Sequence, residues 1–283
     1  MKYLIINADD FGWSRDTVDS IIDLHQKGVI SSTTVMATMP AFNYGLAKLK
    51  ENPALGAGVH LSIFDGRPVL PPAEVTSLVD EDSGLFLSYS EATKRGRRFR
   101  TREVAAEYEA QIERFLESGL KPTHLDVHTM LPYFKSSWYN SIIKLALKYK
   151  LPLRTVLGKD FKEKRSNIAR RIKIPAVLLL ILGRRLISKM DRNGIVHPDY
   201  FISEFSDNDN EADVEEKVHQ LISLIRGLRS GVSEILTHPS SSGELWRRIE
   251  NTVWNDPRID RELQKGEIKL ISYKALSKIG RKH

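Results

Sequence analysis

The stretch KYLIINADDFGWS (residues 2–14) is the most informative part of the chain about its fold. Its apolar run from Tyr3 to Ile6 predicts a buried strand that ends near Asn7, and two adjacent carboxylates, Asp9 and Asp10, follow. In folds of parallel strands and helices, the carboxyl ends of the strands form one face, where polar side chains gather. Two acids side by side at such a place need a chemical reason.

Strand-like and helix-like segments alternate along the rest of the chain. Helices are predicted over residues 14–27, 42–52, 102–118 and 137–150 from their apolar spacing. Further strands are predicted within residues 31–38, 55–63, 122–129, 151–157, 233–241 and 267–276, the last running into a helix. This alternation predicts an α/β fold built from parallel strands, in a barrel or an open doubly wound sheet.

Composition limits the class of protein. The chain has 283 residues, 41% of them hydrophobic, and no cysteine, so disulfides and thiolate metal sites are excluded. No apolar run reaches the roughly 18 to 20 residues that would span a bilayer. Asp9 and Asp10 interrupt the N-terminal apolar run too early for a signal peptide, and we expect a cytoplasmic protein.

The net charge of +7 is unevenly distributed. Residues 162–192 hold ten Lys/Arg and two acids, and residues 94–102 hold six Lys/Arg and no acid. The remainder of the chain is net acidic, so the basicity describes two surfaces. No nucleic-acid-binding motif accompanies it, and we expect no nucleic-acid partner.

Four polar clusters are predicted at carboxyl ends of strands. They are Asp9 with Asp10, His60, the run HLDVH (residues 124–128) and His238. One carboxylate and two imidazoles suit a divalent metal and leave positions for water and substrate. The second of two adjacent acids can then stay off the metal as a base, which gives the pair a chemical reason.

Other interpretations of these clusters stay open at this stage. Strand alternation would place His124, Asp126 and His128 on one side, as a ligand with an orienting carboxylate. Asp9 and Asp10 could instead cap the following helix. His60 could be a core histidine, and His238 could simply end a strand.

Several motifs resemble the YdjC-like carbohydrate deacetylase family, which includes chito-oligosaccharide and hopanoid-linked sugar deacetylases. They occur in order between Tyr3 and Ser241: NADDFGWS, GVISSTTVMATMPAF, GAGVHLSIFDGRPV, YEAQIERFLESGLKPTHLDVH and ILTHPSS. The resemblance implies a modified (β/α) barrel of the glycoside hydrolase/deacetylase type. It implies one such domain over residues 1–283, with a basic helical insertion around 161–193.

The resemblance also implies an activity and its residues. It implies a divalent metal, Mg²⁺ or Zn²⁺, and hydrolysis of an N-acetyl group from an amino sugar or its oligosaccharide by metal-activated water. By position in the motifs, Asp10, His60 and His128 would bind the metal. Asp9 would be the general base and His238 the general acid.

The chain departs from the family pattern beside one ligand. Val127 stands where the family commonly has Ser, and residues 129–131 stand where further histidines would fall. These departures leave two rivals open: a metal hydrolase of another acyl or lipid-linked sugar, and a non-catalytic sugar- or lipid-binding relative.

The basic segment at residues 164–192 has an apolar middle flanked by Arg and Lys. One interpretation is a core helix or a homodimer helix with solvated ends. The other is peripheral membrane contact, because basic residues that flank apolar ones suit anionic lipid headgroups.

Overall fold

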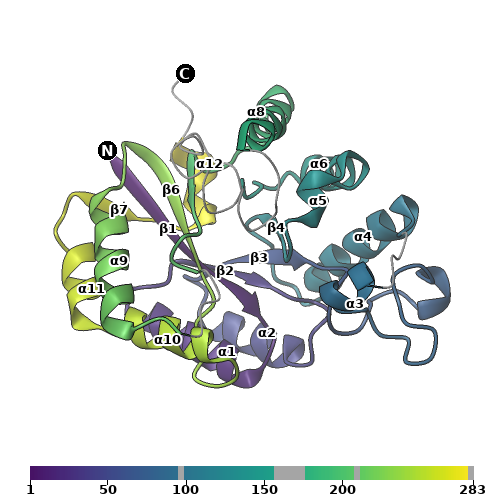
Figure 1. Cartoon of the computed structure of the whole chain (residues 1–283), viewed down its shortest axis with the longest axis horizontal. Coiled ribbons are helices and arrows are strands. Elements are labelled where there is room, and N and C mark those ends of the chain that lie inside the picture. The colour runs from purple at the N-terminus through teal and green to yellow at the C-terminus, as the bar shows by residue number, and fades with distance from the viewer. Residues whose placement is uncertain (95–98, 156–175, 207–210, 280–283) are drawn as a thin grey trace.

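A curled sheet of parallel strands forms the centre of the molecule, and helices lie around its outer side (Figure 1). The computed structural model describes residues 1–94, 99–155, 176–206 and 211–279. Over these residues, seven strands form one sheet in the order β4-β3-β2-β1-β6-β5, with β7 also paired to β1. The strands are β1 (Lys2–Phe11), β2 (Ser32–Val35), β3 (Gly56–Leu61), β4 (Leu125–Val127), β5 (Tyr200–Ile202), β6 (Gly231–Thr237) and β7 (Ile268–Leu270).

Every pairing of these strands is parallel. Their carboxyl ends therefore meet at one edge of the sheet, where the sequence places its polar clusters. The predicted α/β class with a parallel sheet is confirmed.

Strand β1 is longer than predicted and occupies the middle of the sheet. It pairs with β6 from Lys2 to Ala8, with β7 from Lys2 to Leu4 and with β2 from Asn7 to Phe11. The predicted end near Asn7 is wrong, because pairing with β2 extends the strand through both acids. Asp9 and Asp10 belong to the strand itself.

The helices that the structure describes around the sheet are α1 (Arg15–Gln26), α2 (Phe42–Glu51), α3 (Tyr89–Lys94), α4 (Thr101–Glu117), α5 (Leu131–Phe134), α6 (Ser136–Tyr149), α8 (Ala176–Arg192), α9 (Val214–Arg226), α10 (Leu245–Trp254), α11 (Pro257–Leu263) and α12 (Tyr273–Ile279), with a 3-10 turn at Pro72–Glu74. The four helices whose bounds were predicted, α1, α2, α4 and α6, begin and end close to the predicted positions. Ser14 caps α1, and its Oγ accepts a hydrogen bond from the backbone N of Thr17. The alternative in which Asp9 and Asp10 cap this helix is therefore excluded.

The core fills the space between the sheet and these helices. Helix α4 buries Val104, Tyr108, Ile112 and Phe115, spaced three or four residues apart, as an amphipathic helix requires. Burial of each such side chain contributes about 1.5–3 kcal/mol. The packing holds the strands, and hence the polar edge, in fixed positions.

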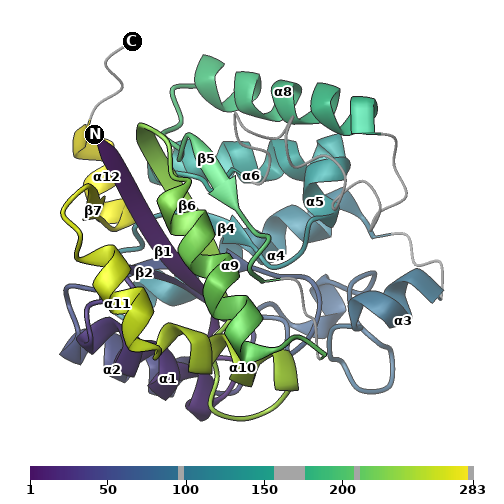
Figure 2. The ribbon, with the colours of Figure 1, turned by 60° about the vertical axis from the view of Figure 1, so that its left-hand side comes forward.

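The predicted strand at residues 151–157 forms only one parallel bridge among the described residues, between Leu153 and Leu125. Of the insertion expected around 161–193, residues 161–175 lie outside the described part. Helix α8 follows and packs beside α6 (Figure 2), where the Tyr139 hydroxyl donates to the Leu186 carbonyl. Within the described ranges, no helix is long and apolar enough to cross a membrane.

Candidate metal centre

A backbone irregularity in β1 brings its two adjacent acids to one site. The register with β2 shifts between Ala8 and Phe11, and Asp10 has a φ of 63°. In a regular strand, neighbouring side chains point to opposite faces. Here, the Nε2 of His60 lies 3.3 Å from Asp10 Oδ1 and 3.8 Å from Asp9 Oδ2. The bulge-like shift therefore explains how two adjacent acids can both approach His60.

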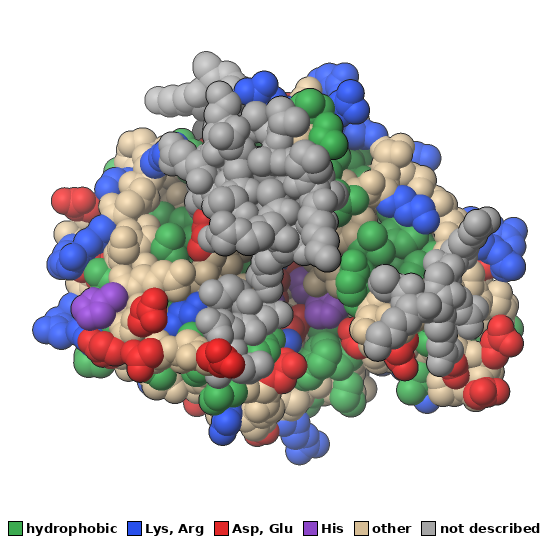
Figure 3. All heavy atoms as spheres, viewed as in Figure 1, with side chains coloured by type: hydrophobic (Ala, Val, Ile, Leu, Met, Phe, Trp, Pro, Cys, Tyr) green, Lys and Arg blue, Asp and Glu red, His purple; other side chains and the backbone are tan. Residues whose placement is uncertain are grey.

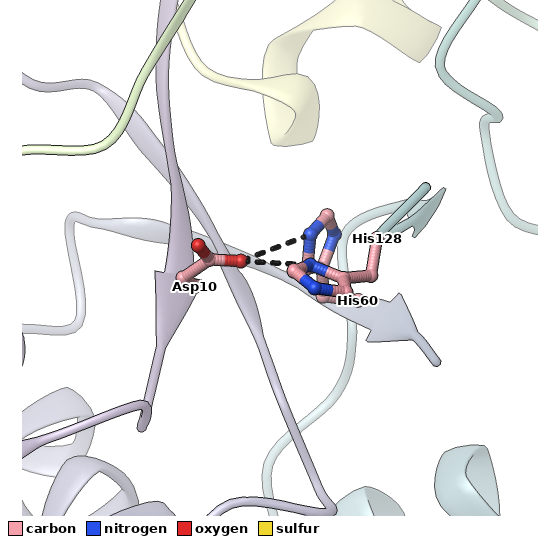
Figure 4. A group of neighbouring side chains, drawn as sticks. All are labelled: Asp10, His60 and His128. Carbon is pink, nitrogen blue, oxygen red and sulfur yellow. Dashed lines mark hydrogen bonds and ion pairs between the residues drawn. The ribbon is translucent and has the colours of Figure 1, made fainter. Parts of the chain in front are cut away.

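The three residues expected to bind metal lie together. Figure 4 shows Asp10 of β1 pointing its carboxylate at the imidazoles of His60 on β3 and His128 just after β4. His128 Nδ1 lies 3.1 Å from Asp10 Oδ1, and one donor atom of each residue lies within 4.8 Å of the others. One carboxylate and two imidazoles fit a divalent cation, because these are usual ligands of a catalytic metal site.

Each histidine of this trio faces a second carboxylate on its other nitrogen. Asp126 Oδ2 lies 2.9 Å from Nδ1 of His60, and Asp65 Oδ2 lies 3.7 Å from Nε2 of His128. A carboxylate as close as Asp126 fixes the ring orientation and tautomer of a ligand histidine, whereas Asp65 is too distant for a direct hydrogen bond and acts on His128 through its charge. Asp126 thus pairs with the histidine of a different motif, and Asp65, with a φ of 60°, was missed by sequence reasoning.

The expectation that His124 shares this site is wrong. β4 includes only Leu125–Val127, so His124 and His128 both flank the strand and alternation does not require them to point to the same side. Its ring is buried and stacks on Tyr273 with centroids 3.7 Å apart, against the backbone of Gly58. Burial holds the pKa of His124 well below its usual range, so it is a neutral core histidine.

Asp9 is held by a buried arginine. Nη1 of Arg154 donates to Asp9 Oδ2 at 2.6 Å and Nη2 donates to Oδ1 at 2.7 Å, while Asn7 and Thr34 also donate to Oδ1. Burial alone would raise the pKa of Asp9, but Arg154 and His60 outweigh it and hold the pKa well below its usual range. Asp9 is therefore ionised and fixed in position.

Arg154 serves more than Asp9. Its guanidinium also donates to Glu234 of β6, with Nε 2.8 Å from Oε1, and contacts Asp126 of β4. Acids from three strands thus share one buried cation, which compensates charges that would otherwise repel each other.

Asp10 has a separate arginine. Nη2 of Arg247 on α10 donates to Asp10 Oδ2 at 2.6 Å, and the guanidinium lies over the rings of Trp13 and Trp246 at 5.3 and 4.5 Å. Burial opposes ionisation of Asp10, but Arg247 and His128 keep its pKa well below its usual range. Oδ1 is left to face the two imidazoles.

The acids act in turn on the histidines. Burial favours the neutral ring, but Asp126 and Asp9 outweigh it and raise the pKa of His60 to about 10. Asp10 likewise raises the pKa of His128. Without a cation both rings attract a proton, which is the electrostatic character expected where a metal ion would bind.

His238, the predicted general acid, has the opposite surroundings. Its Nδ1 lies 2.6 Å from Ser206 Oγ, and Ser206 Oγ lies 2.6 Å from Oε1 of the buried Glu250. Burial lowers the pKa of His238 to about 4, although Asp10 and Asp9 act to raise it. Burial also raises the pKa of Glu250 to about 7.

Sequence reasoning missed the two arginines and Glu250. For α10 a signal existed, because Trp246, Ile249 and Val253 mark its buried side and Arg247 and Glu250 lie beside them at helical spacing. For Arg154 no local signal existed, since the segment around it resembled an ordinary strand.

The polar edge opens to the surface. Figure 3 shows histidine side chains in a recess near the middle of one face, with hydrophobic side chains beside them. Of the two ligand histidines, His128 keeps 16% of its side chain exposed, whereas His60 is buried.

Known proteins resemble the chain over nearly its full length. The model of the YdjC-like protein family matches residues 3–265. A carbohydrate deacetylase of Geobacillus stearothermophilus is 31% identical, with 98% of this chain and 99% of the relative aligned. A carbohydrate deacetylase of Enterococcus faecalis is also 31% identical, with 98% of each chain aligned.

A solved structure from Enterococcus faecalis V583, described as a proposed cellobiose-phosphate cleavage protein, superposes with a TM-score of 0.75. It is 30% identical, and the match covers 97% of this chain and 98% of that one. The expected modified (β/α) barrel and the expected enzyme class, carbohydrate deacetylase, are confirmed at the level of the family. With a family model matching residues 3–265 and relatives matching along both chains, the protein is a member of the YdjC-like family.

Proposed function

We propose that the protein is a metal-dependent hydrolase that removes the N-acetyl group of an amino-sugar unit, such as N-acetylglucosamine in an oligosaccharide. The observation that carries this proposal is the meeting of Asp10, His60 and His128 at one strand edge. Relatives named carbohydrate deacetylase support the choice of reaction.

Asp10, His60 and His128 would hold the metal. Two imidazole nitrogens with one carboxylate suit Zn²⁺ better than Mg²⁺, which prefers oxygen ligands. When bound, the cation supplies Lewis acidity that polarises the acetyl carbonyl and lowers the pKa of water.

The protein side chains would provide the proton transfers and the orientation. Asp9 is ionised and lies beside His60, so it is the proposed acceptor of the proton of water. Arg154 keeps Asp9 oriented but also weakens it as a base. Arg247 fixes Asp10, and His238 is the proposed donor to the amine that leaves.

The proposed partner is an acetylated amino sugar or oligosaccharide. A single domain over residues 1–283 is proposed to bind and hydrolyse it. Homodimer formation and membrane contact through residues 164–192 stay predictions, because residues 156–175 are outside the described ranges. A different acyl or lipid-linked sugar, and a non-catalytic binding role, remain the rivals that the experiment must separate.

The test is acetate release from N-acetylated chito-oligosaccharides after chelation, with and without added Zn²⁺ or Mg²⁺. Acetate release that requires metal, and is greater with Zn²⁺, is the expected result. Bound metal without release would favour a differently decorated or lipid-linked sugar. If the protein neither binds metal nor releases acetate, the proposal is contradicted and the binding-only rival is favoured.

A further inference from the structure

A chain of hydrogen bonds links His238 to a buried carboxylate on another element. Ser206, which follows β5, lies between His238 at the end of β6 and Glu250 on α10, with both contacts at 2.6 Å. The other oxygen of Glu250 accepts from the Thr237 hydroxyl and from the backbone N of His238, each at 2.6 Å. Trp254 donates to Thr237 at 2.7 Å and completes the support.

The surroundings of the hydrogen-bonded chain from His238 to Glu250 disfavour the charged forms of both residues. Glu250 and Ser206 are 3% and 7% exposed. The groups that act on the Glu250 carboxyl are the hydroxyls of Ser206 and Thr237, the backbone amide of His238 and the charge of Arg247. His238 faces Asp9 and Asp10 from β1, His60 from β3, Arg247 from α10 and the ring of Trp246 at 5.3 Å. An imidazolium there costs desolvation, yet a general acid needs a proton to give.

We propose that Glu250 stores the proton for the leaving amine and delivers it through Ser206 and His238. This inference rests on the deacetylase function proposed above. It makes His238 the group that touches substrate, and Glu250 and Ser206 positioning residues that act through it.

The proton movements balance. Before transfer, protonated Glu250 donates to Ser206 Oγ, Ser206 donates to His238 Nδ1, and Nε2 carries the proton that faces the substrate. As the carbon–nitrogen bond breaks, its electron pair takes the Nε2 proton. The Ser206 proton moves to Nδ1 and the Glu250 proton moves to Ser206.

The end state has no imidazolium. Glu250 is then a carboxylate, Ser206 is a neutral hydroxyl, and His238 is a neutral ring with its proton on Nδ1. After the products leave, solvent returns a proton along the same path, and the base releases the one it took from water. Proton transfer along these hydrogen bonds therefore lets His238 act as an acid although its buried surroundings disfavour the imidazolium.

The first experiment compares two leaving groups. N-acetylated chito-oligosaccharide expels an amine that needs a proton, whereas p-nitrophenyl acetate expels a phenolate that does not. Glu250→Gln keeps the hydrogen-bonding shape but holds no transferable proton. We expect Glu250→Gln and Ser206→Ala to lower kcat on the amide by about 10²-fold or more, and on the ester by less than about threefold.

A matched control is Glu262→Gln, another buried carboxylate, which pairs with Arg226 and Lys265 away from His238. We expect it to leave both activities unchanged. Full amide hydrolysis by Glu250→Gln, or an equal loss on both substrates, would overturn the inference. A wild-type protein that hydrolyses no acetylated sugar would instead contradict the proposed function, and a second measurement then decides the proton store.

That measurement is the tautomer of His238 by NMR of ¹⁵N-histidine-labelled protein with and without Zn²⁺, with the signals assigned by their loss in His238→Gln. In wild type we expect the ring proton on Nε2 at pH 6 and on Nδ1 at pH 8.5. In Glu250→Gln we expect it on Nε2 at both pH values. The same tautomer throughout in wild type, or the same switch in Glu250→Gln, would contradict a proton stored on Glu250.

Discussion

The two sides of the candidate site handle buried charge in opposite ways. On the side of β1, β3 and β4, Asp9 and Asp10 are ionised and two buried arginines compensate them. On the side of β6 and α10, nearby charges compensate His238 and Glu250 only in part, so burial favours the neutral form of each. One end of a barrel can thus hold both a charged region for a cation and a neutral region for proton transfer.

The largest effects of substitution are expected in the charged region. We expect His60→Ala to lose the metal and with it the activity, because it removes one of three ligands.

Asp9→Asn should retain the metal but lower kcat by about 10²- to 10⁴-fold, because Asn cannot accept the proton. Metal content after dialysis, measured beside acetate release, checks both. Release of metal by Asp9→Asn would mean that the ligand and base roles are wrongly assigned.

The compensation itself can be removed with Arg154→Met. Since this leaves Asp9, Asp126 and Glu234 buried without their shared cation, we expect a loss of about 3–5 kcal/mol in the free energy of unfolding. Urea unfolding of the variant checks this. The control is Arg258→Met, which breaks the surface pairs with Glu215 and Asp256 and should cost far less. Equal losses in the two variants would show that Arg154 compensates no buried charge.

His124, the core histidine of the HLDVH motif, makes stability depend on pH. Because burial lowers the pKa of folded His124, the unfolded chain binds its proton first as the pH falls below about 6.5. His124 thus reduces stability by about 1.4 kcal/mol for each pH unit below that value, until its folded pKa is reached.

His124→Phe keeps a ring against Tyr273 and removes this titration. We expect its free energy of unfolding to fall less steeply than that of wild type between pH 6 and pH 5. The measurement is urea unfolding at each pH, in which the contributions of other groups cancel between the two proteins. Identical slopes would indicate that His124 becomes protonated in the folded state.

The sequence was a good guide to the fold and to the residues with a local motif. Apolar spacing predicted α1, α4 and α6 within about one residue, because their buried faces are continuous. Strand ends located the polar clusters, and the family resemblance singled out Asp10, His60 and His128 among them as ligands. Their roles stay predictions until the variants are measured.

Long-range electrostatics could not be predicted in this way. Arg154 lies 145 residues from Asp9 and Arg247 lies 237 residues from Asp10, and no pattern in one sequence links such positions. The error over His124 has a local cause: β4 covers only Leu125–Val127, so both histidines of the HLDVH motif lie outside it and strand alternation does not fix their directions. The pairing of Asp126 with His60 depends on the register between β3 and β4, which the sequence does not state.

The central place of β1 has a consequence for biosynthesis. Lys2 pairs with Gly231 and with Ile268, so β1 must wait for partners made about 230 residues later. At roughly 5 to 20 residues per second, the ribosome needs on the order of 10 to 50 s to supply them. During that interval, the apolar face of β1 lacks its final cover, and the nascent chain would benefit from a chaperone that shields it.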